Sequence, residues 1–270
     1  MLSLPTLLTI AGSDPSGGAG IQADLKTMTS IGVYGAAAIT CLTVQNSQGV
    51  ELIKPLASDF VQAQIQAVLN DHNVSHIKIG MTGNAEIIHV LGDQLRSFNG
   101  EVIYDPVLAA TSGKSLLKTE ALTALQDELL PRISYLTPNT AELQLLSNKD
   151  ISSSDDAILC AKVLLDKYPS MKGVVVKGGH LEESSTSISD FLIQPGESIC
   201  ESKRKRIPNP NLHGTGCTYS SALASYLCLG NNIVTAFRLA GKYMHSIIEI
   251  GQNRSVSTSR SNGPLLHGLT

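Results

Sequence analysis

The sequence predicts an α/β protein with a mostly parallel central sheet and helices on both of its faces. Short apolar runs alternate with amphipathic segments along almost the whole chain, which is typical of repeated βα units. The apolar runs are short enough to be buried strands, and the one over 174–177 is rich in β-branched residues. No linker-like stretch occurs before about residue 252. We therefore expect a single domain over residues 1–270, with an irregular Ser-rich tail over about 252–270.

The expected elements follow one another in order along the chain. Apolar residues recur at helical spacing over about 58–71. Pro131 closes a helix over 120–130, and the serines at 152–154 offer caps for a helix over 154–167. A hairpin of two antiparallel strands is expected over 190–206. The other expected strands cover 7–11, 36–40, 77–79, 102–104, 134–136 and 174–177, and the other helices cover 21–31, 86–96, 140–146, 217–228 and 233–250.

Composition excludes several classes of function. The net charge of −3 argues against a general binder of nucleic acids or membrane surfaces, and the basic run over 203–206 favours a solvated edge strand or turn over a polyanion site. No apolar run is long enough to span a membrane, and residues 1–11 lack the basic start of a signal peptide. The five cysteines form no CxxC pair, which indicates reduced thiols without structural zinc. We expect a cytoplasmic protein.

Polar clusters follow one expected strand after another. In doubly wound sheets ligands bind at the carboxyl ends of the strands, so these clusters predict a ligand site on one rim, although ordinary turns use the same residue types. The clusters are Gly12 with Asp14, Thr43 with Gln45 and Asn46, residues 80–83, Asp105 with Pro106, residues 137–139, and residues 177–180.

Two glycine-rich loops, at 12–20 and 213–218, suggest two halves of that site. The second loop, HGTGCT, leads into a small-residue helix whose free N–H groups and positive dipole end suit a phosphate. Cys217 would lie at the mouth of this helix, where the dipole favours a thiolate. The plainer alternative is a glycine-rich turn with a buried cysteine. We expect the second loop to hold phosphate and the first to hold an acceptor.

These motifs together carry a family resemblance that extends over nearly the whole chain. They are residues 9–26, 44–46, 78–81, 105–107, 137–139 with Glu142, 177–180 and 213–218. The sequence resembles the hydroxymethylpyrimidine/phosphomethylpyrimidine kinases of thiamine biosynthesis, in the ribokinase-like superfamily. The resemblance implies a three-layer α/β/α fold and a homodimer. It also implies ATP-dependent phosphorylation of 4-amino-5-hydroxymethyl-2-methylpyrimidine and then of its monophosphate.

The resemblance also implies roles for residues on the acceptor side. Gln45 would bind the aminopyrimidine edge, since an amide offers both a donor and an acceptor. Met81 and Val107 would sandwich the ring, and Asp24 would hold or order the first loop. Ordinary core packing, or an acid in the first helical turn, is the plainer reading of these three. The full set of expected substrate-binding residues is Gln45, Gly12, Ala19, Asp24, Met81 and Val107.

On the phosphate side, Cys217 would accept the hydroxyl proton, at a position where most related kinases carry an aspartate. Gly214, Thr215 and Gly216 would donate N–H groups to the transferring group. Lys177, Asn139 and Thr215 would bind the nucleotide. Asp105 and Glu142 would hold Mg²⁺ with the phosphates of ATP. A pocket-lining cysteine, a turn aspartate and a solvated helix acid are the alternatives for Cys217, Asp105 and Glu142.

Two other nucleotide-binding motifs, the P-loop and GxGxxG, do not match the sequence. Gly113, Lys114 and Ser115 resemble the end of a P-loop, but Leu108 stands where that motif needs glycine, and no GxGxxG follows a strand. Two competing functions remain open. One is a pyridoxal/pyridoxine/pyridoxamine kinase, and the other is a non-catalytic pyrimidine-binding module. The ending at 262–267 matches the family pattern loosely, which leaves the nucleotide lid undefined.

Overall fold

The computed structural model describes residues 4–46, 49–108, 119–179, 186–208, 212–252, 254, 256 and 263–268. Gly113, Lys114 and Ser115, together with His180 and most of the tail, lie outside these residues. Within them, no helix combines the length and the apolar character that a membrane span requires.

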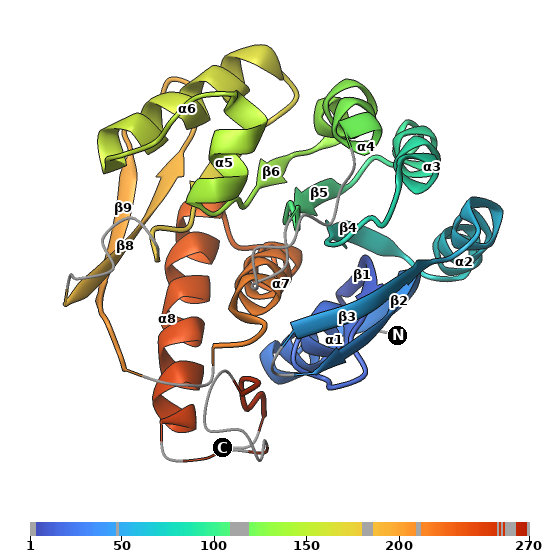
Figure 1. Cartoon of the computed structure of the whole chain (residues 1–270), viewed down its shortest axis with the longest axis horizontal. Helices are drawn as coiled ribbons and strands as arrows, with labels where there is room; N and C mark the ends of the chain where they lie inside the picture. Colours follow the sequence, from blue (N-terminus) through green and yellow to red (C-terminus); the bar gives the residue numbers. More distant parts are fainter. Residues whose placement is uncertain are drawn as a thin grey trace.

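A single nine-stranded sheet runs through the molecule in the order β3-β2-β1-β4-β5-β6-β7-β8-β9 (Figure 1). Six neighbouring strands pair in parallel: β2, β1, β4, β5, β6 and β7. Antiparallel strands form the two edges, with β3 at one and β8 and β9 at the other. The chain leaves β1 for β2 on one side and later returns to β4 on the other, so β1 lies at a topological switch point. The strands are β1 (Thr6–Ser13), β2 (Tyr34–Asn46), β3 (Gly49–Pro55), β4 (Val74–Ile79), β5 (Glu101–Tyr104), β6 (Tyr135–Leu136), β7 (Gly173–Val176), β8 (Ser187–Ile193) and β9 (Cys200–Lys205).

Helices cover both faces of the sheet and bury separate apolar clusters, which confirms the expected layers. Leu7, Ile103 and Val175 pack beneath one group of helices, whereas Leu8, Ile77 and Val174 pack beneath the other. The first group is α1 (Gly20–Ile31), α7 (Thr215–Cys228) and α8 (Ile233–Gly251). The second is α2 (Ser58–Asp71), α3 (Ala85–Leu95), α4 (Thr119–Ala124), α5 (Thr140–Ser147) and α6 (Ser154–Lys167).

Two elements differ from the expectation. Strand β2 continues well past residue 40 and pairs with β3, which the sequence did not predict. Thr43, Gln45 and Asn46 therefore lie within an extended hairpin strand and not in a loop after a strand. The helix expected over 120–130 ends as α4 at Ala124, and then continues as a π-helical turn over Leu125–Leu129 and a 3₁₀ turn over Leu130–Arg132 that contains Pro131.

The basic run lies on the edge strand, as expected. Arg204 forms an ion pair with the buried Asp190 of β8, and Arg206 donates to the Gly179 carbonyl at 3.2–3.3 Å. Arg204 thus joins the two strands of the hairpin, and Arg206 joins the hairpin to the segment after β7, so the run contributes to the fold.

Candidate active site

The first loop, between β1 and α1, is organised by Asp14. One carboxylate oxygen of Asp14 accepts from the N–H groups of Gly18 (3.1 Å) and Ala19 (2.8 Å), and the other accepts from the Ser16 N–H at 2.8 Å. Burial acts to raise the pKa of Asp14, but hydrogen bonds from His213 and from these loop groups outweigh it and hold the pKa below its usual value. The carboxylate is therefore ionised and acts only as an acceptor.

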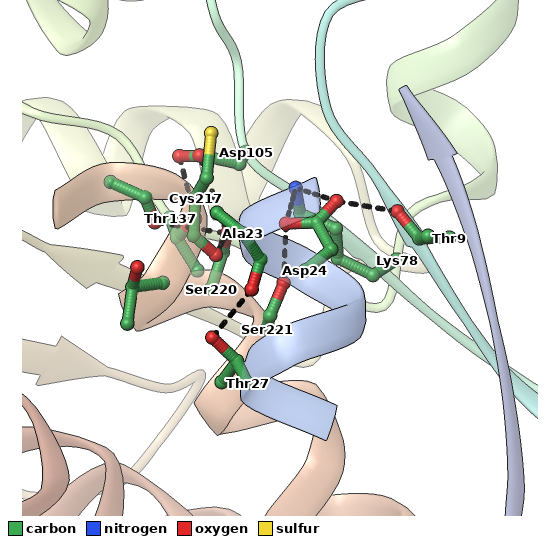
Figure 2. Close-up of polar contacts among 12 residues, drawn as sticks. Thr9, Ala23, Asp24, Thr27, Lys78, Asp105, Thr137, Cys217, Ser220 and Ser221 are labelled. Atoms are coloured by element: carbon green, nitrogen blue, oxygen red, sulfur yellow. Dashed lines mark hydrogen bonds and ion pairs between the residues drawn. The ribbon is translucent and has the colours of Figure 1, made fainter. Parts of the chain in front are cut away.

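Asp24, expected to order that loop, has other partners. Its fully buried carboxylate receives Lys78 Nζ at 2.9 Å on both oxygens, Thr9 Oγ1 at 2.5 Å and Ser221 Oγ at 2.6 Å (Figure 2). The sequence assignment is wrong in this respect, because Asp24 is the fifth residue of α1 and faces the sheet interior. Asp14 orders the loop, and Asp24 joins α1 to β1, β4 and α7.

The two glycine-rich loops meet directly. Gly214 adopts φ +86°, and a Cβ there would overlap the Gly18 carbonyl, so only glycine permits this approach. His213 lies beside the same contact. Its backbone N–H donates to the Gly263 carbonyl, and a Cβ on Gly18 would collide with the His213 ring and with Pro264. Pro264 of the tail thus packs against the first loop.

Helix α7 begins immediately after this contact, as the sequence predicts. The Thr215 N–H donates to the Leu212 carbonyl at 3.3 Å, so it is engaged and not free for a phosphate. The N–H groups of Gly216 and Cys217 belong to the first turn, where the helix supplies no acceptor. A Cβ on Gly216 would lie 3.4 Å from Lys177 Nζ and 3.5 Å from Asp105 Oδ2. The free end of α7 therefore faces a lysine and a carboxylate.

Lys177 and Asp105 form the charged floor of this half. Lys177 Nζ lies 2.6 Å from Asp105 Oδ1. Thr137 and Ser220 lie within hydrogen-bond distance of the same carboxylate, at 3.2 and 3.3 Å (Figure 2). Burial acts to raise the pKa of Asp105, but Lys177 and Lys78 lower it below its usual value. Burial acts to lower the pKa of Lys177, which Asp105 and Glu142 nevertheless hold above its usual value. Both groups are charged at neutral pH.

Asn139 and Glu142 form a capping box at the start of α5. Glu142 Oε2 accepts from the Asn139 N–H at 2.7 Å, and Asn139 Oδ1 accepts from the Glu142 N–H at 2.9 Å. Lys177 Nζ lies 4.0 Å from Glu142 Oε2. Lys177 and Asn139, expected to bind the nucleotide, therefore lie beside the expected metal ligands Asp105 and Glu142. Burial and the charge of Asp105 raise the pKa of Glu142 to about 7, although Lys177 opposes this.

The donor set is compatible with Mg²⁺ supplied with a nucleotide. Among the described residues no group of three or more His, Cys, Asp or Glu side chains could hold a metal ion by itself. Mg²⁺ often takes only one or two carboxylates and completes its shell with water and phosphate oxygens. Asp105 and Glu142 supply two such carboxylates, and burial holds the pKa of Glu142 above its usual value although Lys177 lies nearby.

Cys217 does not have the lowered pKa that its helix position predicts. The pKa of the half-buried thiol is raised to about 11. Burial raises it most and Asp24 and Asp105 add to this, while Lys78 and the Gly20 N–H oppose them. Desolvation and two buried carboxylates therefore outweigh the opposing effects of Lys78 and the Gly20 N–H. The thiol is protonated at neutral pH.

The acceptor half lies on β1, β2 and the segment after β4. Gln45 faces His213, with 3.2 Å between Gln45 Nε2 and His213 Nε2. A Cβ on Gly12 would lie 3.4 Å from Met81 Sδ, so these two expected substrate residues are neighbours. Ala19 is the N-cap residue of α1, and the half-buried Val107 lies two residues beyond Asp105.

Sequence reasoning assigned no role to three polar residues of the site. Asp14, Lys78 and His213 all lie inside motifs that carried the family resemblance, and that was the available signal. Their partners lie far away in the sequence: His213 Nε2 is 3.0 Å from Asp14 Oδ2, across 199 positions. Only the tertiary fold reveals such pairs.

Comparisons with known proteins identify the family to which this chain is related. A family profile described as phosphomethylpyrimidine kinase matches residues 14–265. A hydroxymethylpyrimidine/phosphomethylpyrimidine kinase of Rhizobium meliloti (strain 1021) is 40% identical over 260 residues, covering 96% of this chain and 96% of that protein. The crystal structure of phosphomethylpyrimidine kinase from Clostridium difficile 630 has a TM-score of 0.78 at 38% identity, covering 89% of this chain and 98% of that chain.

A second kind of kinase shares the fold. The pyridoxal kinase of Staphylococcus aureus, solved with AMP-PCP and pyridoxal, has a TM-score of 0.86 at 30% identity, covering 99% of this chain and 94% of that chain. These likenesses confirm the ribokinase-like α/β/α fold. The family profile and the full-length identity to pyrimidine kinases separate this chain from the pyridoxal group. The chain belongs to the phosphomethylpyrimidine kinase family and is a kinase.

Proposed function

We propose that the protein uses ATP to phosphorylate 4-amino-5-hydroxymethyl-2-methylpyrimidine and then its monophosphate, in thiamine biosynthesis. The observation that carries the proposal is the meeting of two unlike halves at Gly18 and Gly214. One half holds Lys177, Asp105 and the free end of α7, and the other presents the Gln45 amide. A relative that is 40% identical over 96% of both chains bears the name of this activity.

In this mechanism the protein mainly positions the reactants and stabilises charge. Lys177 and the N–H groups of Gly216 and Cys217 stabilise the oxygens of the transferring phosphoryl group. Mg²⁺, when held by Asp105 and Glu142, neutralises charge on the nucleotide phosphates. Asn139 fixes Glu142 through the capping box. The packing of Gly12 against Met81 forms one apolar wall for the ring, and Val107 supplies another.

Cys217 contributes less as a base than the helix position alone suggests. A thiol with a pKa of about 11 is almost wholly protonated at neutral pH and accepts no proton in that form. Phosphoryl transfer through a loose transition state needs little early proton removal. We therefore assign Cys217 to contact with the acceptor hydroxyl, and base catalysis to its minor thiolate population.

A substrate assay tests the proposal. ADP release is measured with the aminopyrimidine alcohol, its monophosphate and pyridoxal, and the products are separated. We expect turnover on the two pyrimidines at well above the pyridoxal rate, and its loss in Lys177→Met but not in the edge-strand control Lys205→Met. Preferred turnover of pyridoxal would establish the competing kinase activity. Binding of the pyrimidine without turnover would leave only a binding module.

We propose that the enzyme is a cytoplasmic homodimer, as the family resemblance implies. Leu42, Val44 and Leu52 are 46%, 50% and 59% exposed on the β2–β3 hairpin, and Val44 is paired with Leu52 in the strand register. A second copy would cover this apolar face. Light scattering should give the mass of a dimer for the native protein and of a monomer for Val44→Lys with Leu52→Lys. A native monomer would contradict the proposed dimer.

A further inference from the structure

The Gln45 carboxamide lies between two polar groups from different parts of the chain. Its Nε2 is 3.2 Å from His213 Nε2, and its Oε1 is 3.2 Å from Thr43 Oγ1. The oxygen and nitrogen of a carboxamide are almost equal in size, so the partners decide which end lies where. Both partners have a second contact that determines whether they donate or accept.

His213 must donate from Nε2. That nitrogen lies 3.0 Å from Asp14 Oδ2, an ionised oxygen that already accepts from the Gly18 and Ala19 N–H groups. A carboxylate has no proton to give, so the proton lies on His213 Nε2 in either the neutral or the cationic ring. A nitrogen that carries a proton cannot accept one from an amide NH₂. An amide nitrogen facing His213 would therefore bring two donors together.

The Thr43 hydroxyl must act as a hydrogen-bond acceptor toward Gln45. Its hydroxyl lies 2.9 Å from the Ser13 carbonyl oxygen, which can only accept. The single proton of Thr43 is used there, and only lone pairs remain toward Gln45. An amide oxygen facing Thr43 would therefore bring two acceptors together. A half-turn of the carboxamide turns both mismatched pairs into hydrogen bonds.

We propose that His213 and Thr43 act as positioning residues that fix Gln45 with its carbonyl oxygen toward His213 and its amide nitrogen toward Thr43. The His213 N–H is then shared between Asp14 and the Gln45 oxygen, and one Gln45 N–H donates to Thr43. The other N–H and the second oxygen lone pair stay available to a ligand. The site accordingly takes a ring edge with its donor on the His213 side and its acceptor on the Thr43 side.

This orientation determines specificity, on the assumption that the proposed function is correct. A 4-aminopyrimidine has an amino donor beside a ring-nitrogen acceptor. The 4-oxo analogue has the reverse order, a carbonyl acceptor beside a ring N–H donor. A fixed Gln45 selects the amino form, whereas an amide free to rotate could serve either edge.

Substitution of Thr43 tests the inference. The ratio of kcat/KM for the 4-amino alcohol to that for the 4-oxo alcohol is measured in the native enzyme, Thr43→Val and Thr43→Ser. We expect Thr43→Val to reduce the ratio about tenfold or more, with KM for ATP unchanged, because one end of the amide is released. Thr43→Ser keeps the hydroxyl and should keep the native ratio. An unchanged ratio in Thr43→Val would overturn the proposal.

A spectroscopic measurement is independent of activity. Long-range ¹H–¹⁵N spectra, with the signals assigned through His213→Gln, report which ring nitrogen of His213 carries the proton. A proton on Nε2 supports the proposed orientation, and a neutral ring protonated only on Nδ1 overturns it. Should the native enzyme phosphorylate neither pyrimidine, the proposed function fails, and the spectrum still decides the orientation.

Discussion

Gly216 lies in the first turn of α7, where it faces Lys177 and Asp105. Its missing side chain leaves room beside Lys177 Nζ and Asp105, at 3.4 and 3.5 Å from a Cβ position. We expect Gly216→Val to lower kcat/KM about 100-fold or more, since an oxyanion-hole donor alone contributes about 10²–10³-fold. The γ-methyl groups would occupy the space of the phosphoryl group, while the helical backbone accepts valine. Steady-state kinetics and the melting temperature measure the two effects. Near-normal turnover would rule out a phosphate cradle at this loop.

Cys217 shows where reasoning from local sequence ends. Its place in the first turn of α7 was predictable, and the helix dipole would favour a thiolate. The pKa of about 11 comes from burial and from Asp24 and Asp105, which lie more than 100 positions away in the sequence. Glycine motifs likewise identified both loops, but they could not reveal that Asp14 orders the first loop in place of Asp24.

The chemistry of Cys217 leads to a pH prediction. Because the thiol pKa is raised, the thiolate fraction is small at neutral pH and grows about tenfold per pH unit below the pKa. We expect iodoacetamide to label Cys217 slowly at pH 7, with the rate rising at that slope to pH 9, as followed by mass spectrometry. Cys217→Ala should lower kcat only about 100-fold, the lower end of the range of about 10²–10⁴-fold for acid–base catalysis. Rapid labelling at pH 7 would show that the thiolate is present in the free enzyme.

Among the elements, helix bounds were the most predictable. Caps and apolar spacing located α1, α2 and α6 to within a residue. The β2–β3 hairpin was harder, because its apolar residues Leu42, Val44 and Leu52 are exposed and its polar residues Thr43 and Gln45 face the site. This reverses the usual pattern of a strand on a buried sheet. The π-helical turn at Leu125–Leu129 has no signal in the sequence that we can identify.

An ion pair joins β4 and β5 near their amino ends, away from the candidate site. Its contribution to stability depends on pH. His76 Nε2 lies 3.5 Å from Glu101 Oε2. Burial acts to lower the pKa of His76, but Cys228 and Glu101 raise it from 6.5 to about 9. Hydrogen bonding from His76, together with Lys172 at 2.8 Å, outweighs burial and lowers the pKa of Glu101 from 4.5 to about 2. The stabilisation from Glu101 is complete above pH 4.5 and that from His76 below 6.5, so both are complete between these values.

Urea unfolding of Glu101→Gln tests this window. We expect the variant to lose about 1 kcal/mol of unfolding free energy at pH 5.5, the upper range for a partly exposed pair. The loss should shrink as the pH rises through 9, because His76 then loses its charge. Glu51→Gln, on the exposed side of β3, serves as the matched control. An equal loss at pH 5.5 and pH 10 would contradict the assignment to His76.

For the whole molecule, the fold class, the layers and the rim location of the site were predictable from alternating strands and helices. The pairing of Asp24 with Lys78 was not, since nothing local in either segment indicates a partner 54 positions away. This buried pair joins α1 to β4, while Thr9 and Ser221 bring in β1 and α7. This buried cluster connects elements from the first third of the chain to α7 near its end.

Breaking the pair should therefore destabilise the entire fold. We expect Lys78→Met to lower the unfolding free energy by about 3–5 kcal/mol, the usual cost of leaving a buried charge without its partner. Lys78→Met with Asp24→Leu should recover part of that loss, because no uncompensated charge remains. Equilibrium urea unfolding measures both. A double variant as unstable as the single one would show that packing, and not charge, determines the effect.

The contact between the two glycine loops has a consequence for synthesis on the ribosome. His213 and Ser221 reach Asp14 and Asp24 across 199 and 197 positions, so residues near one end of the chain complete a site begun near the other. Closing so long a loop is slow and follows the formation of local structure. A nascent chain that lacks α7 already contains β1, α1 and β4, yet it has neither the second glycine-rich loop nor the contact of His213 with Asp14. Catalytic competence is thus acquired in one late event, when the last fifth of the polypeptide docks onto the first.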